Sequence, residues 1–212
     1  MNGKRLLVLG ASGPTGRHLV SQALARGHTV TALARRAGAL ELDRPDLRFV
    51  ACDVTQDQAT LAQALEGQDA VISALGRGLS FRSQHLQARA ARVLVPLLER
   101  LGPKRFVYLS AFGVGEMGRE APWLPWLFIH TMLVGIYRDK AIAESLLRAS
   151  RLDWTIVSPV QLTDRLATSR YRVGEHLPLR GAPSVARADV AEAILNCLAD
   201  PATIGKALIV AP

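Results

Sequence analysis

The chain has 212 residues, 49% of them hydrophobic, and a formal net charge of +8 with an isoelectric point near 10.3. This length and apolar content exclude a largely disordered chain and indicate one α/β domain instead of two. The arginines are scattered along the chain, and no helix-turn-helix pattern accompanies them. We therefore expect no nucleic-acid partner.

The cysteine and histidine positions argue against disulfides and metals. Cys52 and Cys197 form no CxxC pair, and the five histidines show no metal-ligand spacing. Residues 1–9 carry no signal-peptide pattern, and no apolar run is long enough to span a bilayer. We expect a cytoplasmic protein without a transmembrane segment, and its oligomeric state stays open between monomer and homodimer.

Strand and helix patterns alternate from one end of the chain to the other. Strands are expected at 5–9, 28–34, 47–51, 69–75, 105–109, 154–157 and 207–210. Helices are expected at 14–26, 57–66, 86–101, 139–149 and 190–198, with a kink or a break in the hydrogen-bond ladder at Pro96. This order predicts a single Rossmann-type doubly wound α/β domain over 1–212, with a mostly parallel sheet.

One apolar segment breaks the alternation, an insertion at about 118–137. Its residues 122–137 hold two of the three tryptophans and are interrupted by Pro125, His130 and Gly135. Four roles remain open for it: a helix buried against the sheet, the lining of an apolar substrate pocket, a subunit interface or a membrane contact.

A glycine-rich loop follows the first strand and opens the first helix. Its glycines let the chain turn sharply and let backbone approach a pyrophosphate, while the helix N-terminus offers free N–H groups. The strand–turn–helix context predicts dinucleotide binding. The residues of the loop are Gly10, Ala11, Ser12, Gly13, Pro14, Thr15 and Gly16.

The end of the second strand indicates which dinucleotide is bound. An NAD site usually carries Asp or Glu there, whereas this chain has Arg35 and Arg36, which suit a 2′-phosphate. The sequence thus favours NADP(H) over NAD(H). Two further groups are expected beside the cofactor, and Asp53 could equally cap the next helix. These groups are Asp53 and Val54 after the third strand and Ala74, Leu75 and Gly76 after the fourth.

Together these residues resemble the atypical short-chain dehydrogenase/reductases, in the branch of NmrA-like proteins and the biliverdin reductase B (flavin reductase) group. The resemblance covers almost the whole chain. It rests on GASGPTG at 10–16, CDV at 52–54, DAVISALG at 69–76, VYLSAFG at 107–113, RDKAIAESLLRAS at 138–150, DWTIVSP at 153–159 and ADVA at 188–191. It implies an NAD(P)-binding protein, often an NADPH-dependent reductase of conjugated acceptors.

The resemblance also implies an incomplete active site. Ser110 matches the serine beside the nicotinamide, Lys140 the lysine of the YxxxK pair, and Pro159 a proline that positions the nicotinamide. The tyrosine position of that pair is Ile136, and Tyr137 next to it is turned by about 100 degrees on a continuous helix. Ser110 could instead be satisfied by nearby backbone, and Lys140 could form a surface ion pair with Asp139 or Glu144.

Two functions follow from this pattern. The first is an NADPH-dependent oxidoreductase that transfers hydride to a flavin, quinone or similar conjugated acceptor, with Ser110 and Lys140 at the reacting centre and a small aromatic or quinonoid substrate. Gln161, where the biliverdin reductase B group has a histidine, leaves biliverdin itself open. The alternative is a non-catalytic NAD(P)-binding redox sensor of the NmrA-like type, which the missing tyrosine favours.

Overall fold

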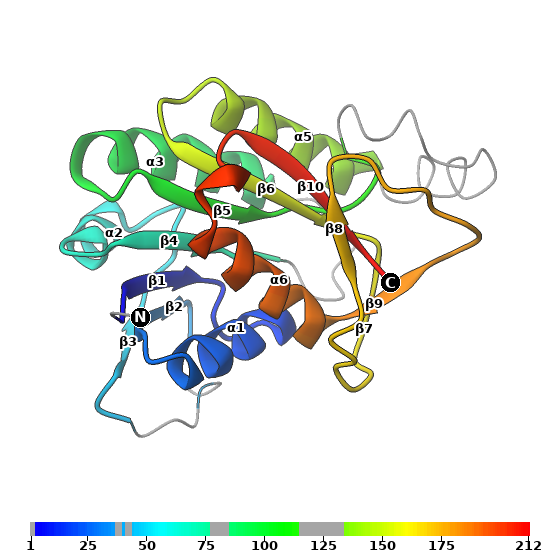
Figure 1. Cartoon of the computed structure of the whole chain (residues 1–212). Coiled ribbons are helices and arrows are strands. Elements are labelled where there is room, and N and C mark those ends of the chain that lie inside the picture. The colour runs from blue at the N-terminus through cyan, green and yellow to red at the C-terminus, as the bar shows by residue number, and fades with distance from the viewer. Residues whose placement is uncertain (1–2, 37–39, 41–43, 77–84, 115–133) are drawn as a thin grey trace.

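An eight-stranded sheet forms the middle of the molecule, as the computed structural model in Figure 1 shows. The structure describes residues 3–36, 40, 44–76, 85–114 and 134–212. The strand order is β3-β2-β1-β4-β5-β6-β10-β8, and every neighbouring pair is parallel except β10 and β8. The expected doubly wound, mostly parallel fold is therefore confirmed.

The strands and helices alternate as in repeated βαβ units. The strands of the large sheet are β1 (Arg5–Leu9), β2 (Thr29–Ala34), β3 (Leu47–Ala51), β4 (Ala70–Ser73), β5 (Arg105–Leu109), β6 (Asp153–Pro159), β8 (Arg172–Gly174) and β10 (Lys206–Ala211). The helices are α1 (Pro14–Ala25), α2 (Gln58–Leu65), α3 (Leu86–Leu101), α5 (Val134–Arg148), α6 (Arg187–Ala199) and the short 3-10 helix η3 (Pro201–Thr203).

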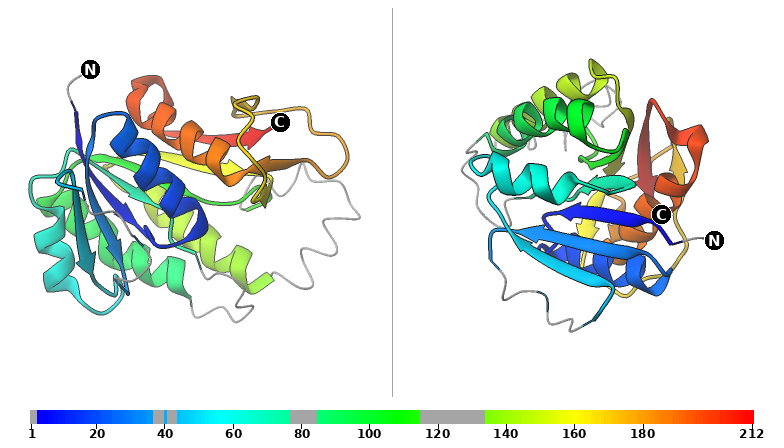
Figure 2. Two further views of the ribbon diagram at one scale, coloured as in Figure 1. Left: turned by 90° about the horizontal axis from the view of Figure 1, so that it is seen from below. Right: turned by 90° about the vertical axis from the view of Figure 1, so that its left-hand side faces the viewer.

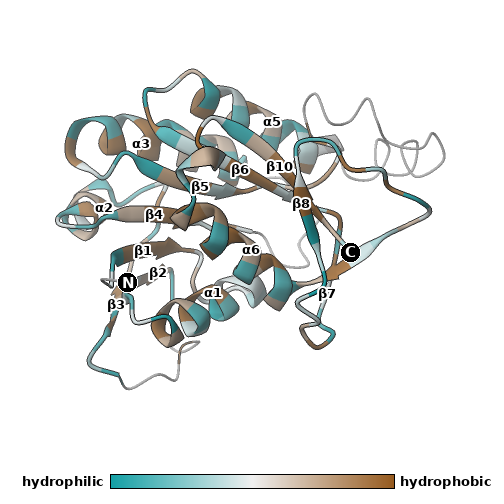
Figure 3. Cartoon of the chain, viewed as in Figure 1, coloured by the Kyte–Doolittle hydropathy of each residue, from teal (hydrophilic) through white to brown (hydrophobic). Residues whose placement is uncertain are grey.

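Helices cover both faces of the sheet. In the two views of Figure 2, α1 and α6 lie side by side on one face, while α2, α3 and α5 cover the other. Because both faces are buried, β1 is apolar after its first residue, Arg5, and β4 is apolar up to its last residue, Ser73. Figure 3 shows both strands as largely hydrophobic ribbons between helices of mixed character.

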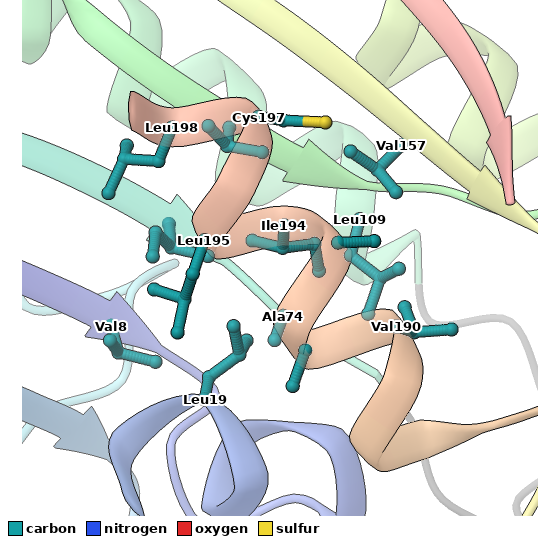
Figure 4. Close-up of a cluster of buried hydrophobic side chains, with 14 of the residues drawn as sticks. Val8, Leu19, Ala74, Leu109, Val157, Val190, Ile194, Leu195, Cys197 and Leu198 are labelled. Carbon is teal, nitrogen blue, oxygen red and sulfur yellow. The ribbon is translucent and has the colours of Figure 1, made fainter. Parts of the chain in front are cut away.

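Each face of the sheet has its own hydrophobic core. On one face, α6 inserts Val190, Ile194 and Leu198 against Leu109 of β5 and Val157 of β6, as Figure 4 shows. On the other face, leucines of α2, α3 and α5 pack against Leu7, Leu33 and Ile156. These two layers hold the strands in place, so that the carboxyl ends of the parallel strands form one edge of the sheet.

The structure adds elements that the sequence patterns did not predict. Three short strands were missed, namely β7 (Gln161–Thr163), β8 and β9 (Ser184–Ala186), and β7 pairs with β9 in a separate two-stranded sheet. Helix α3 continues through Pro96, which lies on an exposed position, so it does not end there. Helix α5 begins at Val134, five residues before its expected start, because the end of the apolar segment is already helical.

Most of the apolar segment, residues 118–133, lies outside the described residues, so its proposed roles stay predictions. Within the part of the chain that the structure describes, no helix combines the length and apolarity needed to cross a membrane. The same residues include no group of three or more His, Cys, Asp or Glu side chains arranged to hold a metal ion.

Candidate cofactor and active site

The sheet reverses its winding direction between β1 and β4, and ligands of doubly wound folds bind at such a point, beyond the carboxyl ends of the strands. Gly10 leaves β1 with a positive φ of 74°, and its N–H donates to Leu33 O at 3.0 Å. A Cβ on Gly10 would lie 2.6 Å from Ala74 O of the neighbouring strand end. Glycine is therefore required here by both backbone conformation and close approach.

The N-terminus of α1 is left open for an anion. Gly13 is its N-cap residue and forms no side-chain cap, Pro14 occupies the first turn, and no acidic residue lies there. A Cβ on Gly16 would collide with Gly10 O, so this glycine lets the helix pack directly on the turn. Free N–H groups and the positive end of the helix dipole together fit a pyrophosphate.

A hollow of about 360 Å³ adjoins this loop and is lined by Ser12, Arg35 and Arg36. Both arginines are exposed and follow β2 directly. Their guanidinium groups can form the bidentate hydrogen bonds that phosphate oxygens accept. The hollow thus has the size and charge to hold the phosphorylated ribose of an adenine nucleotide.

Asp53 lies at the same edge but does not cap the following helix. Its carboxylate accepts hydrogen bonds from Thr55 N at 2.9 Å and Thr55 Oγ1 at 2.7 Å, which lower the pKa of Asp53, with a smaller contribution from Arg35. Asp57 caps α2 instead, accepting from Thr60 N at 3.0 Å. The capping interpretation of Asp53 was therefore wrong.

The remaining cofactor-side residues continue the edge beyond β3 and β4. Val54 and Ala74 are buried, and Leu75 O accepts a hydrogen bond from Gln87 Nε2 at 2.5 Å. Gly76 is exposed, with open space where a Cβ would lie. Backbone of the β4 end is thus accessible beside the loop of Gly10.

Ser110, the residue after β5, forms a buried pair with a carboxyl group. Its Oγ lies 2.5 Å from Glu144 Oε1 of α5. Burial raises the pKa of Glu144, outweighing the lowering effects of the Ser110 hydrogen bond and of Arg148 and Lys140. The Ser110 hydroxyl is hydrogen-bonded to a side chain and not, as the sequence alternatively allowed, to nearby backbone.

Lys140 reaches the same edge from α5. Its Nζ donates to Leu109 O at 3.2 Å and lies 5.7 Å from the centre of the Tyr108 ring. Desolvation lowers the pKa of Lys140 to about 8, against the opposing fields of Glu144 and Asp139. The side chain is half-buried and turned to the sheet, so Lys140 is not the surface ion pair that the sequence also allowed.

Buried polar groups hold the start of α3 against α5. The Asp139 carboxylate accepts from Gln87 N and Ala88 N, both at 2.9 Å, and so supplies the acceptor that the α3 N-terminus needs. Gln87 also accepts a hydrogen bond from Tyr108 Oη at 3.2 Å. This network fixes the first half of α5, and with it Lys140, relative to β4 and β5.

The course of α5 shows whether Tyr137 takes the place of the missing tyrosine of the YxxxK pair. Val134–Arg148 is one helix, and Tyr137 Oη donates to Phe112 O at 3.0 Å. Burial raises the pKa of Tyr137 above its ordinary value. Its hydroxyl is therefore tied to the chain after β5. Ile136 occupies the position expected for the tyrosine of the YxxxK pair.

The structure brings the expected residues to one edge of the sheet, with two additions. Pro159 is buried at the end of β6, where its O accepts from Phe112 N at 2.9 Å, while Gln161 is exposed beyond it. Glu144 and Gln87 were not predicted as site residues. The spacing of Glu144, four residues after Lys140 on one helix face, was the signal that could have found it.

Comparison with known proteins places the chain among nucleotide-binding proteins. The model of a family described as NAD(P)H-binding matches residues 10–201. YwnB of Bacillus subtilis strain 168, a protein of uncharacterized function, is 26% identical over 206 residues, which cover 92% of each chain.

Solved structures resemble the whole chain. A protein of Bacillus halodurans, named as a candidate NAD-dependent epimerase/dehydratase, aligns with a TM-score of 0.83 at 28% identity, over 99% of this chain and 94% of that one. The anaerobilin reductase ChuY of Escherichia coli O157:H7 aligns with a TM-score of 0.81 at 25% identity, over 97% of this chain and 96% of that one.

Proposed function

Because this chain belongs to the NAD(P)H-binding family, in its atypical short-chain dehydrogenase/reductase-like branch, we propose that it is an NADPH-dependent reductase of a flavin, quinone or similar conjugated acceptor. One observation carries the proposal. An arginine-lined hollow of about 360 Å³ lies at the β2 end of the sheet edge, and Lys140 Nζ and the Ser110–Glu144 pair lie at its β5 end.

The residues of this edge fit a dinucleotide in chain order. The α1 N-terminus and the glycine loop would hold the pyrophosphate, and Arg35 and Arg36 the 2′-phosphate. Lys140 would bind the nicotinamide ribose, and Pro159 would lie beside the nicotinamide ring. The bound cofactor supplies hydride, and the chain supplies binding, orientation and a place for the acceptor.

The missing tyrosine narrows the acceptors that this edge can serve. An alcohol or ketone needs a strong general acid or base at the reacting oxygen. The Tyr137 hydroxyl does not supply one, because it donates a hydrogen bond to Phe112 O. A flavin or quinone instead spreads the negative charge of reduction over its own rings. Such an acceptor depends mainly on being held against the cofactor, with Ser110 as a hydrogen-bond donor. The reductase name of ChuY supports this class by analogy.

A second candidate is a non-catalytic NAD(P)-binding sensor of the NmrA-like type. Ile136 at the tyrosine position favours it, because a protein that senses bound cofactor needs no acid. The two candidates share the cofactor site and differ in turnover.

The first experiment separates these two candidates. Purified protein is mixed with NADPH or NADH and with FMN, riboflavin, a small quinone or biliverdin, and the loss of reduced-nicotinamide absorbance is followed. Saturable oxidation, faster with NADPH, is expected. If NADPH binds in a parallel titration but no acceptor is reduced, the sensor function replaces the reductase.

The cofactor preference is tested at Arg35. Arg35→Ala removes a charged hydrogen bond to the 2′-phosphate, which stabilises binding by about 1.5–3 kcal/mol, so the Kd for NADPH should rise by roughly 10- to 100-fold. The Kd for NADH, which lacks that phosphate, should stay nearly unchanged. Arg48→Ala, at an exposed arginine of β3, is the matched control. Equal losses for NADPH and NADH would contradict the assignment.

A further inference from the structure

Ser110 and Glu144 form an acid–hydroxyl pair that the cofactor site does not require. Ser110 is 4% exposed and Glu144 3% exposed, and 2.5 Å separates Ser110 Oγ from Glu144 Oε1. Ser110 follows β5 at the carboxyl edge of the sheet, whereas Glu144 lies inside α5, one helical turn after Lys140. The pair therefore connects the proposed reacting centre to the layer between α5 and the sheet.

Charged groups approach Glu144 from its own helix and a phenol from the sheet. Arg148 Nη2 comes within 3.9 Å of Glu144 Oε2, and Lys140 lies one turn before it. Tyr108 of β5 is near enough for Glu144 to raise the pKa of its phenol. Around Tyr108, α3 contributes uncharged side chains. Despite the two cations, burial still raises the pKa of Glu144, so its acid form persists above the ordinary value of 4.5.

Reduction of a conjugated acceptor consumes a proton as well as a hydride. The position of the usual proton-donating tyrosine is occupied by Ile136 in this chain, and the Tyr137 hydroxyl donates its hydrogen bond to Phe112 O. Ser110 is placed at the edge, but an alcohol is a weak acid and must be resupplied as it gives up its proton. A buried carboxylic acid in contact with the hydroxyl meets that need.

On the basis of the proposed reductase function, we infer that Ser110 and Glu144 together deliver the proton that the acceptor takes up. With the carboxyl protonated, Glu144 donates to Ser110 Oγ, and the Ser110 proton is free for the acceptor. The acceptor gains two electrons as hydride from the dihydronicotinamide and a proton from Ser110. The Glu144 proton moves to Ser110 Oγ, and solvent reprotonates the carboxylate. The sum is NADPH, acceptor and one proton giving NADP⁺ and the reduced acceptor.

A neighbouring serine provides a matched control. The pairing of Leu109 with Val157 puts Ser110 and Ser158 at adjacent positions, and strand alternation turns both towards α5, like Tyr108 and Ile156. Ser158 Oγ is buried and has no hydrogen-bond partner among the described residues. Ser158→Ala thus removes a hydroxyl from the same face without touching the pair.

The kinetic test compares variants across pH with NADPH and the best acceptor of the initial screen. Wild-type kcat should fall as pH rises through the pKa of Glu144, and deuterated water should slow it. Glu144→Gln and Ser110→Ala should each lower kcat by about 100-fold, flatten this limb and abolish the solvent isotope effect. Ser158→Ala should behave as the wild type does. A second limb near pH 8, from Lys140, should survive in Glu144→Gln.

A spectroscopic test needs no turnover. Infrared difference spectra between the wild type and Glu144→Gln, with NADP⁺ bound and without it, should show the carbonyl band of a buried protonated carboxyl group. That band should disappear as pH is raised. Its absence throughout the pH range in which the protein is folded would overturn the inference, because an ionised Glu144 has no proton to deliver.

The two tests separate this inference from the function on which it rests. If the wild type reduces an acceptor and Glu144→Gln keeps its rate and pH profile, the inference fails and the reductase stands. If no acceptor is reduced, the reductase function fails and proton delivery fails with it, while the infrared band still shows whether the pair stores a proton.

Discussion

Two desolvated cations lie at opposite ends of β5 and have very different surroundings. Arg105 begins the strand and is held by five oxygen atoms. Its guanidinium donates to Asp153 O, Thr155 Oγ1, Leu198 O, Cys197 O and Thr203 Oγ1, at 2.5 to 3.4 Å. Lys140 meets the other end of the strand, where its Nζ donates to Leu109 O.

The difference separates a cation that the fold surrounds with acceptors from a cation that has hydrogen-bond donors left for a ligand. The fork of Arg105 joins β6, η3 and the last carbonyls of α6, where the helix dipole favours a positive charge. Lys140 has three donors, and Leu109 O is the one hydrogen-bond acceptor found for them within the described residues. A half-buried ammonium with donors in reserve is suited to binding a ligand at the carboxyl edge.

The largest effect on stability is expected at Arg105, at the start of β5. Arg105→Met removes the five hydrogen bonds that the guanidinium donates to oxygens of β6, η3 and α6, so the free energy of unfolding should fall by about 2–4 kcal/mol. Urea denaturation measures this change. Arg151→Met, which removes an exposed arginine with a 3.9 Å ion pair to Glu99, should cost about 0.5 kcal/mol or less. Equal losses would show that the Arg105 network contributes nothing particular.

Lys140→Met should produce the opposite pattern. If Lys140 binds the nicotinamide ribose as proposed, loss of that charged hydrogen bond should raise the Kd for NADPH by roughly 10- to 100-fold, while the free energy of unfolding changes by about 1 kcal/mol. Cofactor titration and urea denaturation of the same samples give both numbers. Lys104→Met, an exposed lysine just before β5, is the control. Unchanged NADPH affinity in Lys140→Met would remove this ammonium from the cofactor site.

The smallest effect concerns Glu144 and depends on pH. Because folding raises the pKa of Glu144, the acid stabilises the fold fully below the unfolded value of 4.5, and this contribution is lost as pH rises through the folded pKa. Glu144→Gln, which stays neutral, should therefore gain stability relative to the wild type as pH increases. Melting temperatures of the two proteins across pH measure the difference. A constant difference would mean that folding leaves the Glu144 pKa unchanged.

The comparison also explains what the sequence could predict. The cofactor-binding part of the site is encoded by residues close together in the sequence. The loop with Gly10, Gly13 and Gly16 comes directly after β1, and Arg35 comes directly after β2. A turn and a helix start are encoded within a few residues, so the loop, α1 and β2 were predicted close to their observed bounds.

The rest of the site depends on contacts between distant segments. Glu144 meets Ser110 across 34 residues, and Asp139 meets Gln87 across 52, so neither pair has a local signal. The strands β7, β8 and β9 have three residues each, too few for alternation to show. The structural role of Arg105 was likewise not predictable from the sequence, because its hydrogen-bond acceptors lie on β6, η3 and α6, far from it in the chain.

The direction in which Asp139 points has a consequence for how a cofactor reaches the protein. Although Asp139 adjoins Lys140 in the chain, its carboxylate is directed at the first N–H groups of α3 and compensates the dipole of that helix. Among the described residues at the carboxyl edge, Arg35, Arg36 and Lys140 therefore outnumber the ionised Asp53, and the edge carries a surplus of positive charge. Over about 8 Å in physiological salt, that field attracts an anionic dinucleotide before any contact forms. Dinucleotide capture then gains speed at low ionic strength, and neutral nucleosides gain nothing.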